Sequence, residues 1–257
     1  MLSGSPTRGA TTLPGSAWHG RVAVVSPHLD DAVFSLGASI RAAARRGVAV
    51  DVVTVLAGDP ASEAAADESN ARAGFSTAGE AARLRREEDA RACAHVRARP
   101  LWLDLSDDRA APVGDDKLHD ALQEALEGYD AVLVPGFPLA HPDHVRVACA
   151  ALDVLGDGRV VGLYVEQPYA SWARLARSGR ADRGPTPETS PGLLGLHVDG
   201  PPRWRRHRGR PGEWVAKAKG MSAYASQLRV LRRAPRTRML VYEALHGGEA
   251  VLWVTLR

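Results

Sequence analysis

Short apolar runs alternate with segments of helical periodicity along residues 21–165, and this alternation constrains the fold more than any other feature of the sequence. The first run, residues 21–25, is rich in valine, and Val33, Leu36 and Ile40 then predict a helix at about residues 31–46. Further strands are predicted at residues 48–56, 101–105, 131–134 and 160–165, and further helices at about residues 80–96, 116–126 and 143–155. Apolar strands that alternate with helices are typical of a buried parallel sheet with right-handed crossovers. The sequence therefore predicts an α/β fold, a Rossmann-like three-layer sandwich with a mainly parallel sheet.

The alternation ends after Gln167. Residues 179–212 are rich in Pro, Gly and Arg and predict an extended loop or lid, and a helix is expected at about residues 213–232. The apolar runs 239–244 and 250–256 flank Gly247-Gly248 and predict a closing hairpin, while the small, polar residues 58–79 predict a long loop. We therefore expect one domain at residues 21–257, with a C-terminal extension of loop, helix and hairpin, after a flexible segment at residues 1–20.

The composition is that of an ordinary globular protein, and it excludes several kinds of partner. The formal net charge of +3 is too small to steer nucleic acid, and no apolar run reaches the roughly 20 residues of a membrane helix. Residues 1–20 lack the apolar core of a signal peptide. Cys93 and Cys149 fall in predicted helices and are interpreted as thiols in a reducing compartment. We expect a cytoplasmic protein with a small-molecule partner, without nucleic acid or membrane, and leave a homo-oligomer open.

A cluster of arginines at positions 203, 205, 206, 208 and 210 accounts for the local excess of positive charge. We interpret it as a solvated loop, with contact to an anionic substrate as the alternative.

The turn after the first predicted strand carries an imidazole and two carboxylates, in His28, Asp30 and Asp31. His28 and Asp31 are separated by one helical turn and face the same way, so Asp30 must point elsewhere. One carboxylate can then bind a metal ion while its neighbour stays free as a base.

A second cluster, His141-Pro142-Asp143-His144, follows the fourth predicted strand. In a doubly wound sheet of order 3-2-1-4-5, strands one and four are neighbours, so the turns that follow them face each other. Two imidazoles and one carboxylate with an open position are typical of catalytic zinc, and the spacing alone does not distinguish His141 from His144 as the ligand. Each cluster alone could be a capped helix start or a turn, but two at facing strand ends favour a metal site.

These residues resemble the motifs of the PIG-L/LmbE-like family of zinc-dependent N-deacetylases, relatives of N-acetylglucosaminyl-phosphatidylinositol de-N-acetylase. The first family motif, Ala/Pro-His-Pro-Asp-Asp-Glu, stands here as Pro27-His28-Leu29-Asp30-Asp31-Ala32, and the second, His-Pro-Asp-His, is intact at residues 141–144. Weaker likenesses are Arg85-x-x-Glu88 and the segment from Lys217 through Tyr224 to Ser226-Gln227. The likeness covers about residues 22–227. Leu29 and Ala32 depart from the usual Pro and Glu, which indicates a divergent subgroup of the family.

The resemblance implies a role for each residue of the two motifs. His28, Asp31 and His144 would hold Zn²⁺, with Fe²⁺ as an alternative in the cell. Asp30 would be the general base, and His141 would stabilise the oxyanion or protonate the leaving amine, with Asp143 tuning a nearby imidazole. The implied reaction is removal of an acyl group, acetyl in the first place, from the amine of an N-acetylated amino-sugar conjugate or glycosylated natural product by a zinc-activated water.

Three further residues are candidates for substrate contact. Arg85 could reach a substrate hydroxyl or phosphate, although its charged neighbours favour a solvated helix face. Glu166 and Tyr169 follow the fifth predicted strand and could line the pocket at the same edge of the sheet.

Two alternative functions follow from the same fold. An amidase that cleaves a larger amide, such as a thiol conjugate, would use the same metal site. A non-catalytic Rossmann-like binding protein or a dehydrogenase is disfavoured, because no Gly-x-Gly-x-x-Gly follows the first strand and the candidate ligands are intact.

Overall fold

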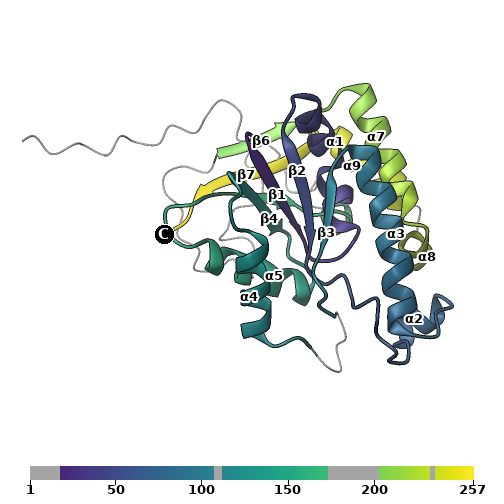
Figure 1. The fold of residues 1–257 in the computed structure, drawn as a ribbon. Coiled ribbons are helices and arrows are strands. Elements are labelled where there is room, and N and C mark those ends of the chain that lie inside the picture. The colour runs from purple at the N-terminus through teal and green to yellow at the C-terminus, as the bar shows by residue number, and fades with distance from the viewer. Residues whose placement is uncertain (1–17, 107–111, 173–202, 232–234) are drawn as a thin grey trace, which may run out of the picture.

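A seven-stranded sheet of order β3-β2-β1-β4-β5-β7-β6 forms the centre of the computed structural model (Figure 1), which describes residues 18–106, 112–172, 203–231 and 235–257. Five neighbouring strands are parallel: β1 (Arg21–Ser26), β2 (Ala49–Thr54), β3 (Arg99–Trp102), β4 (Ala131–Phe137) and β5 (Val160–Val165). The predicted order 3-2-1-4-5 and the Rossmann-like α/β class are confirmed.

Side chains of β1 point alternately into two hydrophobic cores because both faces of the sheet are covered. Val22 and Val24 belong to one core, and Ala23 and Val25 belong to the other. All four are completely buried. The uninterrupted apolar run of this strand therefore reflects a position in which neither face meets water.

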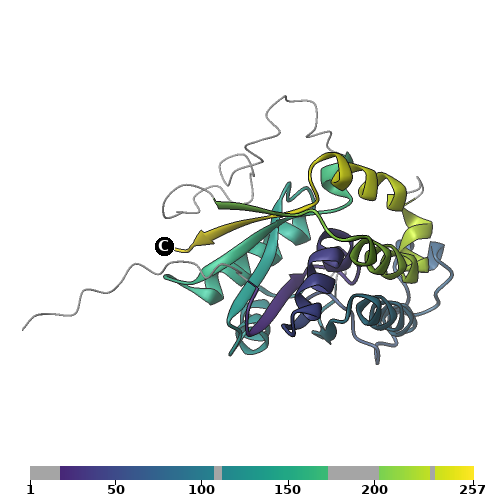
Figure 2. The same ribbon diagram turned by 90° about the horizontal axis from the view of Figure 1, so that it is seen from above.

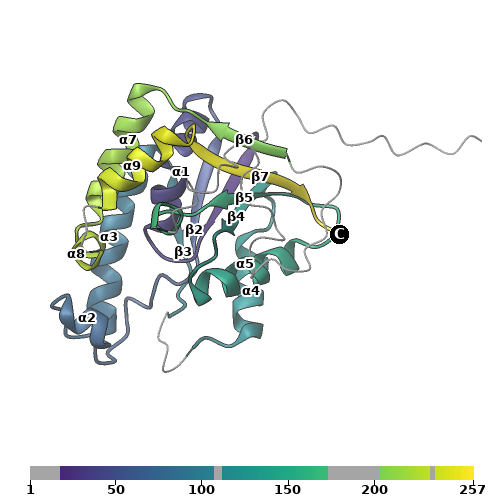
Figure 3. The same cartoon turned by 180° about the vertical axis from the view of Figure 1, so that it is seen from behind.

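Helices cover the sheet in two layers (Figures 1 and 3). One face carries α1 (Asp31–Arg45), α3 (Ala78–Val96) and α7 (Pro211–Ala223), and the other carries α4 (Asp115–Ala125) and α5 (Pro142–Leu155). Viewed from above, α3 and α7 lie side by side (Figure 2). The helices predicted before residue 160 end within one or two residues of those observed.

The predicted C-terminal hairpin is wrong. Residues 239–244 lie within the helix α9 (Pro235–Leu245), and β7 (Glu249–Thr255) pairs antiparallel with β5 and with β6 (Arg203–His207). A short apolar run cannot by itself distinguish a strand from a helix that is buried on one side.

The predicted loop at residues 179–212 is also corrected where the structure describes it. Residues 203–207 form the edge strand β6, and residues 211–212 begin α7, while residues 173–202 lie outside the described part of the chain. Arginines on an edge strand hinder pairing with another chain, and they hide the apolar alternation by which a strand is recognised.

The predicted helix at residues 213–232 is two helices, α7 and α8 (Ala225–Val230), which are separated at Tyr224. The phenolic oxygen of Tyr224 donates a hydrogen bond to Asp89 Oδ1 on α3 over 2.6 Å. Tyr224 is completely buried, so this hydrogen bond fixes its side chain in the core at the point where α7 ends and α8 begins.

Two short helices complete the described elements: α2 (Glu68–Arg72), within the loop predicted at residues 58–79, and α6 (Tyr169–Trp172), after β5. No helix in the described ranges has the length and apolar character needed to cross a membrane. Residues 1–17 of the predicted flexible N-terminal segment lie outside the described part of the chain.

Candidate metal centre

The turn between β1 and α1 is held by the side chain of Ser26. Its hydroxyl donates a hydrogen bond to the carbonyl oxygen of His28 at 2.5 Å and accepts one from the amide of Ala32 at 3.0 Å. The amide of His28 donates to Asp31 Oδ2 over 2.9 Å. These bonds fix His28 and Asp31 relative to each other. Ser26 was not among the predicted site residues; its signal in the sequence is a hydroxyl at the last position of the strand, two residues before the histidine.

The two aspartates of this turn have different surroundings. Asp30 is the N-cap residue of α1, yet its side chain makes no capping hydrogen bond. Asp31 Oδ2 lies 3.2 Å from His144 Nε2 and 3.4 Å from His28 Nδ1. Asp31 therefore belongs to the histidine cluster, and the carboxylate of Asp30 is not used to cap the helix.

The turn between β4 and α5 places two histidines at different depths. His141 is the N-cap residue of α5, and its Nδ1 accepts a hydrogen bond from the amide of Asp143 at 3.2 Å. One turn later, His144 is completely buried. Since the accepting nitrogen carries no proton, the neutral ring of His141 carries its proton on Nε2.

The two turns meet because β1 and β4 are neighbours in the sheet. His28 Nδ1 lies 3.2 Å from His144 Nε2. One ligand atom each from His28, Asp31 and His144 lie within 4.8 Å of one another. Two imidazole nitrogens and one carboxylate oxygen form the donor set of a catalytic zinc site with an open position. These three residues therefore fit a divalent metal ion.

Asp143 lies on the outer side of this cluster. Its Oδ2 is 3.3 Å from His28 Nε2 and 3.4 Å from His141 Nδ1. The ring of His28 thus has one nitrogen toward Asp31 and His144 and the other toward Asp143, an arrangement in which a carboxylate orients a metal-binding imidazole. His28, His141 and Asp143 also form a second, more exposed group of potential ligands that shares His28.

Glu166 lies behind His144 and not at the open side of the site. Its Oε1 is 2.6 Å from His144 Nδ1, and its Oε2 accepts a hydrogen bond from the amide of Leu139 at 2.8 Å. The sequence suggested that Glu166 could line the pocket. In the structure it is completely buried, and both its oxygens are engaged by other groups of the protein. Its position is that of the outer carboxylate that usually orients a metal-binding histidine.

Tyr169, the other residue predicted after the fifth strand, is brought to the cluster. Its ring packs edge-on against His144, with the ring centroids 5.2 Å apart. Burial and the nearby charges of Asp31 and Asp30 raise the pKa of its hydroxyl, which therefore stays protonated at neutral pH.

Burial and charge give the two aspartates different pKa values. Burial, together with the charge of Asp31, raises the pKa of Asp30 to about 7. Burial also opposes ionisation of Asp31, but His144 and the hydrogen bonds with His28 outweigh it, so the pKa of Asp31 lies below its ordinary value. Burial lowers the pKa of His144, but Asp31 and Glu166 outweigh that effect and raise it. At neutral pH Asp31 is ionised, whereas Asp30 can gain or lose a proton.

Arg85 lies in the wall of a hollow of ≈230 Å³, the Asn70 hollow, which also includes Leu29 of the first motif. Its guanidinium lies over the ring of Phe75, 6.0 Å from the centroid. Arg83 and Glu87 on the same helix are exposed, as a solvated face predicts, but Arg85 is half-buried. Asn70 was not among the predicted residues; as the only asparagine of the chain, it offers no pattern by which to find it.

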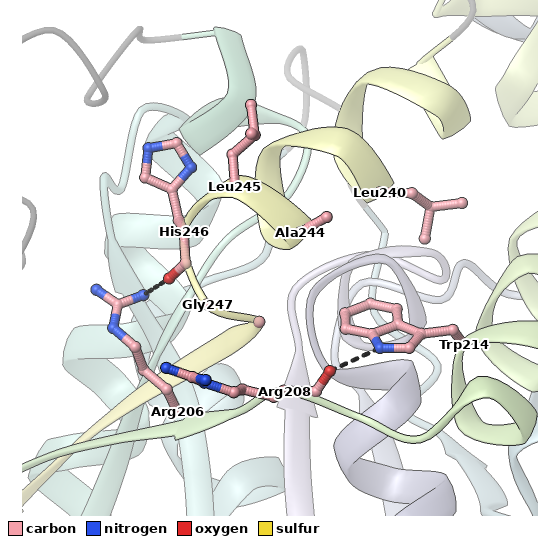
Figure 4. Close-up of a pocket in the computed structure, with 9 residues that line it drawn as sticks. Arg206, Arg208, Trp214, Leu240, Ala244, Leu245, His246 and Gly247 are labelled. Carbon is pink, nitrogen blue, oxygen red and sulfur yellow. Dashed lines mark hydrogen bonds between the residues drawn. The ribbon is translucent and has the colours of Figure 1, made fainter.

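A larger hollow of ≈820 Å³ lies where β6, α7 and the end of α9 meet (Figure 4). Arg206 donates a hydrogen bond to the carbonyl oxygen of His246 at 2.7 Å, and the indole of Trp214 donates to the carbonyl oxygen of Arg208 at 2.7 Å. Its lining includes none of the predicted site residues. The arginine cluster of the sequence therefore belongs to an edge strand and this separate hollow.

Comparison with protein families finds one match that covers both motifs. The family model described as PIG-L, GlcNAc-PI de-N-acetylase, matches residues 23–155. Among curated proteins, 2'-N-acetylparomamine deacetylase of Streptomyces fradiae is 30% identical over 198 residues, which are 69% of this chain and 68% of that protein.

Solved structures show the same likeness over most of the chain. A deacetylase from the biosynthesis pathway of teicoplanin is 26% identical with a TM-score of 0.70, over 92% of this chain and 98% of that chain. The A40926 pseudoaglycone deacetylase Dbv21 is 27% identical with a TM-score of 0.69, over 92% of this chain and 97% of that chain. The N,N'-diacetylchitobiose deacetylase of Pyrococcus horikoshii, 17% identical with a TM-score of 0.53 over 92% and 82%, shares the fold.

Proposed function

This chain belongs to the PIG-L family of de-N-acetylases, and from that premise we propose that it deacetylates an amino sugar within a small natural product, with a bound divalent metal ion. The family and the enzyme class predicted from two short motifs, an N-deacetylase that hydrolyses an amide C–N bond, are confirmed. The substrate class is supported by the relatives, which are named for the deacetylation of 2'-N-acetylparomamine and of the A40926 pseudoaglycone.

The observation that carries the proposal is the convergence of ligand atoms from His28, Asp31 and His144 within 4.8 Å. We assign these three as the metal ligands because Glu166 holds the second nitrogen of His144. When bound, a divalent ion acts as a Lewis acid that polarises a carbonyl and lowers the pKa of water to about 7. The donor set suits Zn²⁺, with Fe²⁺ as the alternative occupant.

Asp30 is assigned as the general base. Its side chain is not engaged in capping α1, and its pKa of about 7 suits a group that must accept and return a proton at neutral pH. As the water oxygen attacks the acyl carbon, Asp30 receives the water proton. When the C–N bond breaks, Asp30 returns that proton to the departing nitrogen, so the products are acetate and a primary amine.

His141 is assigned to the charge that develops on the acyl oxygen. Its Nδ1 accepts a hydrogen bond from the amide of Asp143, so the proton that the neutral ring can donate toward that oxygen is the one on Nε2. Asp143 is assigned to orient the two rings, that of His28 through its carboxylate and that of His141 through its backbone amide. Tyr169 is assigned to the wall of the site beside His144.

The test combines metal analysis with a substrate panel. Purified protein should contain about one divalent ion per chain, and N-acetylated amino sugars and glycosylated natural products should release acetate and free amine in equal amounts. A wild-type chain that binds no divalent metal contradicts the proposal. Faster cleavage of a larger acyl amide, such as a thiol conjugate, would favour the amidase alternative, and metal binding without any cleavage would favour a binding protein.

The extent of the domain, the cellular location and the partner of the enzyme are also proposals. We propose a single catalytic domain at residues 21–257 and a reducing, cytoplasmic location, in keeping with Cys93 and Cys149, which are not joined in a disulfide. The proposed partner is the small-molecule substrate, and a homo-oligomer stays open.

A further inference from the structure

The neighbouring strands β1 and β4 part before β1 reaches its end. β1 pairs with β4 from Val22 to Val24, whereas it pairs with β2 as far as Ser26. The two strands therefore separate shortly before the segments that carry His28 and His144. A crevice between neighbouring parallel strands at this point is where open α/β sheets bind their ligands.

Pro135 on β4 explains why the pairing ends there. The amide of Val55 donates to the carbonyl oxygen of Ser26 at 2.9 Å, so Ser26 faces β2 and the carbonyl of Val25 faces the other side, toward β4. In the register of β1 and β4, the amide that would continue the ladder to this oxygen belongs to residue 135. Proline has no N–H, so the ladder lacks its donor at this position.

Tyr164 on β5 gives the carbonyl of Val25 a different donor. Tyr164 is paired with Pro135 in the sheet, and its hydroxyl reaches past the proline to donate to the carbonyl oxygen of Val25 at 2.9 Å. Tyr164 and Val25 are both completely buried. Since a buried carbonyl without a partner is costly, the hydroxyl satisfies a group that the proline would otherwise leave unpaired.

This hydrogen bond acts on the start of the metal-binding turn. Val25 directly precedes Ser26, whose hydroxyl donates to the carbonyl oxygen of His28 and accepts from the amide of Ala32. Ladder hydrogen bonds with β2 hold this part of β1 from one side. Tyr164 holds it from the side on which the pairing with β4 has ended. The exit of β1 is thus fixed from both sides just before the first proposed ligand.

The surroundings of Tyr164 keep its hydroxyl in the donating form. Burial raises the pKa of this phenol well above its usual value, and the nearby negative charges of Asp31 and Glu166 raise it further. The phenol therefore stays protonated near neutral pH and can donate to Val25. The influence of Asp31 also shows that this hydroxyl lies close to a proposed metal ligand.

We infer that Tyr164 is a positioning residue of the metal centre. Its hydroxyl replaces the backbone donor that Pro135 lacks, and the bond to Val25 fixes the exit of β1. The proline lets β1 and β4 part, and the tyrosine keeps the freed end of β1 in place. Tyr164 acts on the ligands through the backbone of β1. The inference rests on the proposed function, since it concerns the metal ligands assigned there.

Tyr164→Phe tests this role through metal affinity, measured by competition with a chelator. The variant keeps the ring and removes the hydroxyl, so Val25 loses its donor and the affinity should fall by about 10- to 100-fold. Tyr129→Phe is the matched control, because its buried hydroxyl donates to Asp51 at 2.5 Å from a position before β4 begins. Both variants lose a buried hydrogen bond and should unfold at a lower temperature, but only Tyr164→Phe should weaken metal binding.

Amide hydrogen exchange of the metal-free protein measures the same effect without metal. The amides of His28 and Ala32 both donate within the turn. In Tyr164→Phe they should exchange about 10-fold faster, because the turn opens more often. Tyr129→Phe should speed this exchange only as far as its lower global stability requires.

Pro135→Ala tests the exchange of one donor for the other. It restores an N–H at the position that faces Val25, so in the Tyr164→Phe background it should recover metal affinity by about 3-fold or more. By itself it should leave the affinity of the wild type unchanged, because the hydroxyl of Tyr164 already satisfies the carbonyl. Effects that simply add in the double variant would contradict the replacement of donors.

The outcomes distinguish this inference from the proposed function. If the wild type binds a divalent ion and Tyr164→Phe binds it as tightly, the inference is overturned and the metal centre stands. An equal loss of affinity in Tyr129→Phe also overturns it, because general stability then explains the effect. If the wild type binds no divalent ion, the proposed function fails, and hydrogen exchange tests Tyr164 alone: unchanged exchange at His28 and Ala32 in Tyr164→Phe overturns the inference.

Discussion

Asp30 and Asp31 are adjacent in the sequence and have opposite electrostatic surroundings. Burial and the charge of Asp31 raise the pKa of Asp30 to about 7, whereas the contacts with His144 and His28 keep the pKa of Asp31 below its ordinary value. Carboxyl groups whose pKa values are driven apart in this way are suited to different roles. The spacing in the sequence predicted that the two side chains diverge, and the structure shows the contacts that make them differ.

Substitution of each aspartate tests the division of roles. Asp30→Asn should lower the rate of acetate release by about 100-fold or more, because the general base is lost. It should keep the bound metal, because the three ligands remain. Asp31→Asn should lose both activity and metal, because a ligand is lost. Metal content by elemental analysis and acetate release give the comparison. Metal loss in Asp30→Asn with retention in Asp31→Asn would reverse the assignment.

Glu166→Gln tests the orientation of His144. The amide side chain cannot act as a charged acceptor for His144 Nδ1, so metal affinity should fall by about 10- to 100-fold. Competition with a chelator measures the affinity. Glu124→Gln, on the exposed face of α4, is the matched control and should bind metal as the wild type does. A normal affinity in Glu166→Gln would show that the buried carboxylate has no part in holding the metal.

At the scale of elements, the helices α1, α3 and α7 pack closely on one face of the sheet, because α7 has a glycine, Gly220, where it meets the other two. A Cβ added at Gly220 would lie 3.0 Å from Val33 Cγ1 on α1 and 3.2 Å from the carbonyl oxygen of Ala92 on α3. The late segment that resembles the family's Lys…Tyr-x-Ser-Gln helix therefore packs directly on α1, which begins at the metal centre.

Gly220→Ala should lower the free energy of unfolding by about 1–3 kcal/mol, because the added methyl group overpacks this contact. Gly212→Ala, in the first turn of the same helix with no atom within 4 Å of the added Cβ, should be neutral or stabilise by up to about 1 kcal/mol. Urea denaturation of both variants measures the difference. Equal stabilities would show that the close approach of the helices does not depend on glycine.

Apart from the short helix α2, the elements before residue 160 could be predicted from the sequence because each strand and helix has its own apolar period. The later ones could not, for separate physical reasons. The apolar run of α9 fits either period, and β6 is an edge strand whose arginines mask its alternation. Tyr224 separates two helices while its side chain is held by a hydrogen bond to Asp89, a residue 135 positions away.

Across the whole molecule, a buried ion cluster joins elements that are remote in the sequence. Lys217 Nζ on α7 lies 2.7 Å from Glu243 Oε1 on α9 and 2.7 Å from Glu249 Oε1 on β7. Glu249 also accepts hydrogen bonds from the amides of Ala38 and Ser39 on α1, at 2.9 Å and 2.6 Å. Lys217 is completely buried, so the cluster links four elements at one point of the core.

The cluster predicts a dependence of stability on pH. Burial, with the charge of Glu249, raises the pKa of Glu243 to about 8 against an ordinary 4.5, although Lys217 opposes the shift. The folded state therefore binds a proton more tightly than the unfolded chain, so this contribution to stability is complete below about pH 4.5 and is lost as the pH rises through 8. Asp89, whose pKa burial raises to about 6, acts in the same direction at lower pH.

Glu243→Gln should flatten the decrease of unfolding free energy between about pH 5 and pH 8, because the amide does not titrate. Glu127→Gln, an exposed site on the other side of the sheet, should keep the wild-type slope. Denaturation midpoints across this pH range measure both. A slope that is identical in wild type and Glu243→Gln would contradict the raised pKa.

The sequence by itself determined the parallel strand order, the helices that follow those strands, and the meeting of the two motifs, because each depends on local periodicity and on one rule of sheet topology. Only the tertiary structure decided that Glu166 holds His144, that Asn70 and Arg85 share a hollow beside Leu29, and that Lys217 lies between Glu243 and Glu249. The physical reason is that periodicity reports which face of an element is apolar. It carries no information on which polar side chain, from an element far along the chain, meets that face inside the core.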